Sequence, residues 1–183
     1  SESIFEGEIS PFVHLHTHSE YSMLDGCIPV AELVARAKRW GHTHLALTDH
    51  GSMHGVVGFY SDAKKAGIVP IIGCEIYHEK GPWVFELPKE ILPDFHFHLI
   101  LLAKNTAGYK KLLRIVSSGF IGASLQDVPV VPFSSFLPYS TDLIALSACQ
   151  RGELDFYVKK LRDSRTPTTL SVVSVSSAFP GRF

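Results

Sequence analysis

The sequence is poor in cysteine and lacks both a long apolar run and an excess of either charge. Its three cysteines, Cys27, Cys74 and Cys149, are an odd number at wide spacing. That pattern excludes a disulfide framework and a CxxC zinc module, and it indicates a reducing compartment. No apolar run reaches the roughly 18 residues that span a bilayer, and no charged and apolar signal sequence opens the chain. We therefore expect a soluble, cytoplasmic protein.

The balance of charge limits the partners that composition alone predicts. Seventeen Lys and Arg face 18 Asp and Glu in 183 residues, so there is no general positive excess to attract a polyanion. The 45% hydrophobic and 19% charged content is typical of a folded globular domain. Binding to nucleic acid would therefore need a local site.

Histidine is abundant, at ten residues, and it is the commonest metal ligand in proteins. His14, His16 and His18 alternate within an apolar run, so on a strand their side chains share one face. His16 and His18 would stand about 7 Å apart, close enough to reach one divalent ion at about 2 Å. The alternative, exposed histidines at a strand end without a metal, stays open on this pattern alone.

Strand-like and helix-like segments alternate along the chain. Helical periodicity predicts four helices. The first follows Pro29, the second ends at Gly67, the third ends near Gly119, and the fourth lies at 154–161. This order implies right-handed crossovers and a parallel sheet, open or closed into a barrel. Prolines at 129, 132 and 138 predict an irregular connection over 119–139. The predicted strands are 12–17, 44–48, 69–77, 98–103 and 143–147.

Metal ligands also accompany the later predicted strands. His50, Glu75 and Cys149 lie at the ends of three of them, and His98 begins another. Because α/β proteins bind ligands at the carboxyl ends of parallel strands, we expect these side chains to converge. Asp49 is either a helix N-cap or a residue that orients a ligating histidine, and His14 could assist the ligands in the same way.

Three segments carry a resemblance to a known family: FVHLHTHSEYSMLDG, ALTDHGSMHGVVGFYSDAKKAGIVPIIGCEIY and HFHLILLAKNTAGYKKLLRIVS. They resemble, in order and spacing, the PHP (polymerase and histidinol phosphatase) family, and within it the N-terminal domains of bacterial DNA polymerase III alpha subunits. The resemblance implies a distorted (β/α) barrel of parallel strands that holds up to three divalent ions, zinc or manganese, or else magnesium. The ligands that it implies are His16, His18, Asp25, His50, Glu75, His98 and Cys149, in pairs on three ions, with Glu75 bridging two of them.

The same resemblance implies a function. Metal ions a few ångströms apart activate a bridging water and clamp a phosphate ester, so we expect a phosphoesterase or 3′–5′ exonuclease site within a DNA-directed DNA polymerase that acts in replication. DNA, a proofreading exonuclease subunit and other replisome subunits are the expected partners. One alternative is a metal-stabilised platform that docks the proofreading subunit without chemistry. Another is a free-standing phosphatase of the histidinol phosphatase type.

One departure from the family bears on completeness. The family adds an Asp-x-His pair on a late strand, and none follows Cys149. We therefore expect a barrel that is incomplete at its C-terminal end. The expected domains are an N-terminal extension at 1–11, a partial PHP domain at 12–162, and a Ser/Thr-rich tail at 163–183 that is disordered or non-native.

Overall fold

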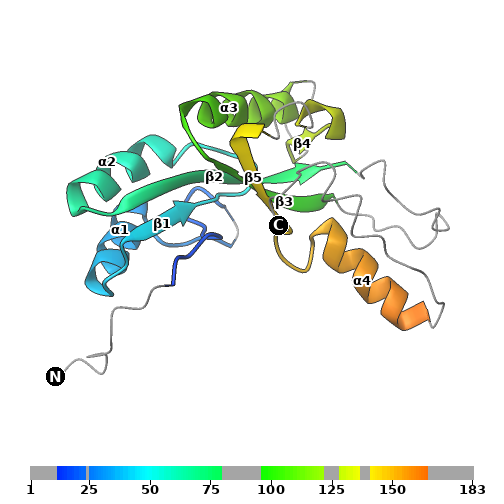
Figure 1. Ribbon diagram of the computed structural model, residues 1–183, viewed down its shortest axis with the longest axis horizontal. Helices are drawn as coiled ribbons and strands as arrows, with labels where there is room; N and C mark the ends of the chain where they lie inside the picture. Colours follow the sequence, from blue (N-terminus) through cyan, green and yellow to red (C-terminus); the bar gives the residue numbers. More distant parts are fainter. Residues whose placement is uncertain (1–11, 24, 80–95, 122–127, 137–140, 165–183) are drawn as a thin grey trace.

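The computed structural model describes residues 12–23, 25–79, 96–121, 128–136 and 141–164. The predicted extension at 1–11 and residues 165–183 of the predicted tail lie outside the described residues. The elements follow the order α1 Val30–Arg39, β1 His44–Leu47, α2 Val56–Ala66, β2 Val69–His78, β3 Phe97–Ala103, α3 Thr106–Phe120, β4 Val130–Val131, η2 Phe133–Ser135, β5 Leu143–Leu146 and α4 Glu153–Ser164 (Figure 1).

The four predicted helices are confirmed, and local chemistry explains where they begin and end. Pro29 precedes α1, and Gly67 ends α2 in the left-handed conformation at φ 74°, which glycine adopts without a steric penalty. Asn105 caps α3, because its side chain accepts a hydrogen bond from the backbone N–H of Gly108 at 2.9 Å. None of the helices in the described ranges is both long enough and apolar enough to cross a membrane.

The sheet has the strand order β1-β2-β3-β5, and β4 pairs with β2. The α/β class is confirmed, but the expectation that all strands are parallel is wrong for β3, which runs antiparallel to β2 and β5. His78 at the end of β2 pairs with Phe97 at the start of β3. The chain therefore re-enters the sheet at the end where it left, without a crossover to the other end.

The first predicted strand, 12–17, is wrong, because no strand is assigned there and the chain bends at His16. The segment nonetheless lies beside β1: Ala46 N–H donates to the carbonyl of His14 at 3.0 Å, and Thr48 N–H donates to the carbonyl of Thr17 at 2.9 Å. A step of two residues, from Ala46 to Thr48, thus matches a step of three residues, from His14 to Thr17. The extra residue breaks the strand alternation that the sequence pattern predicted.

The connection at 119–139 is more regular than expected where it is described. Val130 and Val131 form β4 and pair in parallel with Tyr77 and His78 of β2. Val131, with 1% of its surface exposed, joins a core that also holds Leu112 and Phe136. Burial of these apolar side chains against α3 stabilises a short strand that the prolines alone did not predict.

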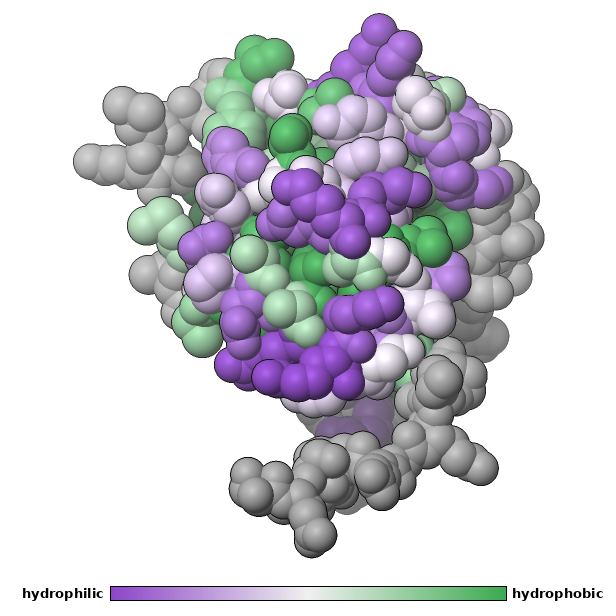
Figure 2. Space-filling view, turned by 90° about the vertical axis from the view of Figure 1, so that its left-hand side faces the viewer, coloured by the Kyte–Doolittle hydropathy of each residue, from purple (hydrophilic) through white to green (hydrophobic). Residues whose placement is uncertain are grey.

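The helices cover the sheet in two groups. Apolar side chains of α1 and α2, such as Val34 and Phe59, pack with Leu45 of β1, and α3 packs on β2 and β3. Figure 1 shows α4 extending at the opposite end of the molecule from α1 and α2. In the face that Figure 2 presents, apolar residues occupy a central area between hydrophilic residues above and below it.

Candidate metal centre

An open pocket of about 710 Å³ lies at the edge of the sheet where β1 and β5 end. Glu75 lies within β2 and only 1% of its surface is exposed. His50 follows the end of β1 by three residues, His98 is the second residue of β3, and Cys149 follows β5 by three residues. The pocket brings together all seven residues that the sequence analysis selected: His16, His18, Asp25, His50, Glu75, His98 and Cys149.

The direction of β3 explains why His98 reaches this pocket. His98 lies at the start of its strand, so in an all-parallel sheet it would lie at the edge opposite His50 and Cys149. Because β3 is antiparallel to β2 and β5, its first residues meet the ends of β1 and β5. Two isolated bridges, His50 with Glu75 and His98 with Gly152, join these chain ends.

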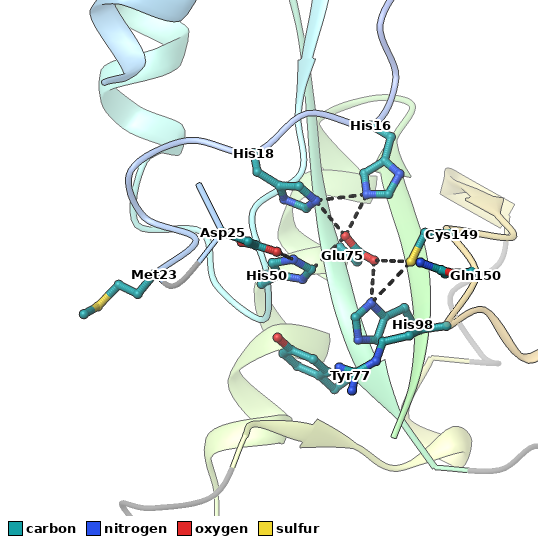
Figure 3. Close-up of a pocket in the computed structure, with 11 residues that line it drawn as sticks. His16, His18, Met23, Asp25, His50, Glu75, Tyr77, His98, Cys149 and Gln150 are labelled. Carbon is teal, nitrogen blue, oxygen red and sulfur yellow. Dashed lines mark hydrogen bonds and ion pairs between the residues drawn. The ribbon is translucent and has the colours of Figure 1, made fainter. Parts of the chain in front are cut away.

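The carboxylate of Glu75 is the centre of the cluster (Figure 3). Its Oε2 lies 2.7 Å from Nε2 of His16 and 3.0 Å from Nε2 of His18. Its Oε1 lies 2.7 Å from Nδ1 of His98. Nδ1 of His50 lies 3.5 Å from Oε2. One buried carboxylate thus faces four imidazoles. It joins two sets of histidines, His16 with His18 and His50 with His98.

These contacts shift two pKa values in opposite directions. Burial alone would raise the pKa of Glu75, but hydrogen bonds with His16, His18 and His98 outweigh burial and hold this pKa far below its ordinary value. Burial would lower the pKa of His18, yet the hydrogen bond and the charge of Glu75 raise it above 6.5. Glu75 therefore remains ionised and attracts positive charge to His18.

Asp25 lies against His50. Its Oδ2 is 2.7 Å from Nε2 of His50, and the His50 ring stacks on that of His18 with centroids 4.2 Å apart and planes 13° apart. Gly26 allows the tight turn after Asp25, because a Cβ there would lie 2.0 Å from the carbonyl oxygen of Ser19. The Asp-Gly pair therefore both shapes a turn and brings a carboxylate to the pocket.

Asp49 holds the loop that carries His18 and Asp25. It is 2% exposed and accepts hydrogen bonds from Ser19 N–H at 2.6 Å, Ser19 Oγ at 2.7 Å and Ser22 Oγ at 2.7 Å. The Oγ of Ser22 in turn lies 3.3 Å from Nδ1 of His18. Asp49 thus fixes the loop, and the N-cap of α2 is instead Gly55.

Two other predicted residues lie at different distances from the centre. Sγ of Cys149 is 3.9 Å from both Oε1 of Glu75 and Nδ1 of His98, so it borders the second set of histidines. His14 does not line the pocket. Its ring packs edge-on against those of Phe12 and His42, at 4.8 and 5.1 Å between centroids, because the bend at His16 separates it from the other two histidines of its segment.

The pocket also contains residues that the sequence analysis missed. Tyr77 stacks on His50 at 5.8 Å and lies edge-on to His98 at 4.9 Å. Strand alternation could have revealed it, since Tyr77 lies two residues beyond Glu75 on the same face of β2. The other additions come from loops and turns, where no periodicity indicates side-chain direction: Met23, Gln150 and Arg151.

The donor atoms fit divalent metal ions. Two groups, His16–His18–Glu75 and His50–Glu75–His98, each place three donor atoms within 4.8 Å of one another. The buried Nδ1 of His50 has no hydrogen-bond partner within the described ranges and faces Glu75, whereas Nε2 on the other side of the ring faces Asp25. Imidazole and carboxylate donors beside a thiol suit zinc or manganese.

The chain is similar to known proteins over most of its length. The PHP domain family matches residues 14–173. DNA polymerase III subunit alpha of Borreliella burgdorferi is 43% identical over 143 residues, which cover 78% of this chain and 12% of that protein. The same subunit of Campylobacter jejuni is 39% identical, covering 82% and 12%, and an error-prone DNA polymerase of Symbiobacterium thermophilum is 35% identical, covering 94% and 16%. The chain thus spans 12 to 16% of the length of these relatives.

Proposed function

This chain belongs to the PHP domain family, and from that premise we propose that its pocket is a multi-metal centre that hydrolyses phosphoesters. In the proposal, His16 and His18 hold one ion, Asp25 and His50 a second, and His98 and Cys149 a third. Zinc or manganese suits these donors, with magnesium as the alternative. The observation that carries the proposal is Glu75, whose two oxygens face different histidines and could therefore bridge ions.

The chain's own residues prepare the pocket for this chemistry. Bound divalent ions would supply Lewis acidity to a phosphate ester and a water of lowered pKa. Glu75 remains ionised because its pKa is held low by the surrounding imidazoles, so it offers full negative charge at neutral pH. Asp49 keeps the His18 loop in place through buried hydrogen bonds. The donors are thus positioned before an ion binds.

The relatives suggest the substrate class and the cellular context. Two of them are named DNA polymerase III subunit alpha, which supports the proposal that this chain is the N-terminal PHP domain of a replicative DNA polymerase. The substrate would then be the 3′ end of a DNA strand, removed by 3′–5′ exonuclease activity. Under this proposal the partners are DNA and replisome subunits, including a proofreading exonuclease subunit.

A nuclease assay with matched histidine variants tests the proposal. A 3′-labelled single DNA strand is incubated with the chain and Mn²⁺ or Zn²⁺, beside a simple phosphate monoester. We expect nucleotide release that His16→Ala abolishes and His44→Ala preserves, because His44 lies at the start of β1 and not in the pocket.

Other outcomes would replace the proposal. Metal binding without turnover of either substrate would instead support a metal-stabilised docking platform. Release of phosphate from the monoester alone would support a phosphatase of the histidinol phosphatase type. Either result would overturn the assignment of DNA as substrate.

A further inference from the structure

The turn that brings Cys149 to the pocket brings Arg151 to it as well. We infer that Arg151 binds the phosphate group of the substrate and so contributes to substrate affinity, separately from the residues that would hold metal. This inference rests on the proposed function, because it assigns the recognition of the phosphate at that same site. The supporting observations are the build of the turn, its attachment to β3 and the charges that line the pocket.

The turn at 147–152 has a demanding backbone conformation. Ala148 adopts a left-handed φ of 61°, a conformation that is unfavourable for a residue with a Cβ. A Cβ on Gly152 would lie 2.0 Å from the carbonyl oxygen of Ser147, and Gly152 N–H donates to the carbonyl of Cys149 at 2.7 Å. Unfavourable backbone conformations of this kind concentrate at functional sites.

A backbone hydrogen bond attaches the turn to the histidine cluster. His98 N–H donates to the carbonyl oxygen of Arg151 at 3.1 Å, and Nδ1 of the same His98 contacts Glu75 at 2.7 Å. The main chain of Arg151 is therefore held next to His98, which itself contacts the carboxylate of Glu75. A long side chain from this position can reach a group bound in the pocket.

The pocket carries charges of both signs near the place where a phosphate would bind. Among the described residues that line it, Asp25 and Glu75 carry negative charge and Arg151 carries permanent positive charge. Tyr77, which contacts His50 and His98, lines the same pocket as Arg151.

The guanidinium has the chemistry for this task. It donates two parallel hydrogen bonds to two oxygens of one phosphate, whereas the ammonium of lysine acts as a point charge. Its charge would also offset the repulsion between Glu75 or Asp25 and an anionic substrate. Arg151 therefore matches a phosphate group in both geometry and charge.

Calorimetric titration of the full chain with inorganic phosphate, after loading with Mn²⁺, tests the inference. The variants are Arg151→Met, Arg151→Lys and, as a control on the exposed surface of α1, Arg39→Met. We expect Arg151→Met to weaken phosphate binding about 10- to 100-fold, the range for a hydrogen bond to a charged group. Arg151→Lys should bind phosphate with intermediate affinity, and Arg39→Met should match wild type.

The number of Mn²⁺ ions bound per chain distinguishes failure of the Arg151 inference from failure of the proposed function. If Arg151→Met binds Mn²⁺ and phosphate as well as wild type does, the inference is overturned while the proposed function survives. If wild type binds no Mn²⁺, the proposed function fails and the inference fails with it. Should Arg151→Met not fold, Arg151→Lys decides, since unchanged phosphate affinity there contradicts a bidentate role.

Discussion

The Oε2 atom of Glu75 lies 2.7 Å from Nε2 of His16, although 59 residues separate them in the chain. The contact arises because segment 12–18 lies beside β1 and β1 pairs in parallel with β2, the strand of Glu75. The same carboxylate contacts His98 through its other oxygen. Glu75 is thus the residue through which changes at one set of histidines should affect the other.

Replacing Asp49 should destabilise the loop and weaken metal binding together. Asp49→Ala removes an acceptor of three buried hydrogen bonds, so the free energy of unfolding should fall by about 3 kcal/mol. Asp62→Ala is the control, because Asp62 pairs with Lys65 on the surface of α2 at 3.7 Å, a contact worth about 0.5 kcal/mol. Urea unfolding measures the free energy of unfolding of the two variants and of wild type. Equal losses would refute the structural role of Asp49.

Replacing Cys149 should change the preference among metals. Its thiol borders Glu75 and His98, and thiolate favours zinc over manganese. Cys149→Ser should therefore reduce zinc affinity by about 10-fold or more and reduce manganese affinity less. Competition with a chromophoric chelator measures both affinities. Cys27→Ser, at an exposed cysteine outside the pocket, serves as control, and a parallel loss for both metals would contradict the prediction.

The pH dependence of the metal-free protein should reflect His18. Its pKa is raised above 6.5 despite burial, because Glu75 accepts its hydrogen bond. The stabilisation is therefore fully present below pH 6.5 and is lost as the pH rises through the higher pKa of the folded state. His18→Gln should lower the free energy of unfolding more at pH 6 than at pH 8.5. A difference between wild type and variant that is independent of pH would count against this assignment.

His78 should make the fold sensitive to acid. It is 2% exposed beside Phe97 and Phe136, and burial lowers its pKa from 6.5 to about 4. The unfolded chain binds a proton more tightly than the folded chain between these values, so stability falls as the pH falls from 6.5 to 4, by up to about 3 kcal/mol.

Substitution isolates this contribution. His78→Leu removes the titrating ring, so the variant should lose less stability than wild type between pH 7 and pH 4. His44→Leu, a less buried histidine at the start of β1, should retain the wild-type slope. Chemical unfolding at a series of pH values gives the comparison. Parallel curves for wild type and His78→Leu would show that the buried imidazole does not control the acid response.

Part of the pocket could be predicted because some of its candidate ligands occur where regular segments end. His50 and Cys149 follow apolar runs that become β1 and β5, and segment ends can be located from hydrophobic patterns. Gly67 likewise marks the end of α2 through its left-handed backbone. Local signals of this kind require no knowledge of the tertiary structure.

Other features depend on long-range contacts that a pattern does not contain. The alternation of His14, His16 and His18 predicted one shared face, but pairing with β1 introduces an extra residue and a bend at His16. The antiparallel direction of β3, in which Phe97 pairs with His78 of β2, is likewise a long-range feature. Arg151 reaches the pocket through a turn, where side-chain directions follow no period.

We propose that Glu75 links metal ions held by two sets of histidines, His16 with His18 and His50 with His98. The most direct test of this proposal is the number of Zn²⁺ or Mn²⁺ ions bound per chain, measured by mass spectrometry of the metal content after loading and removal of free metal, in wild type and in Glu75→Gln. We expect at least two ions per wild-type chain and a loss of more than one ion in the folded variant. Wild-type protein that binds no ion, or a variant that binds as many as wild type, would contradict it.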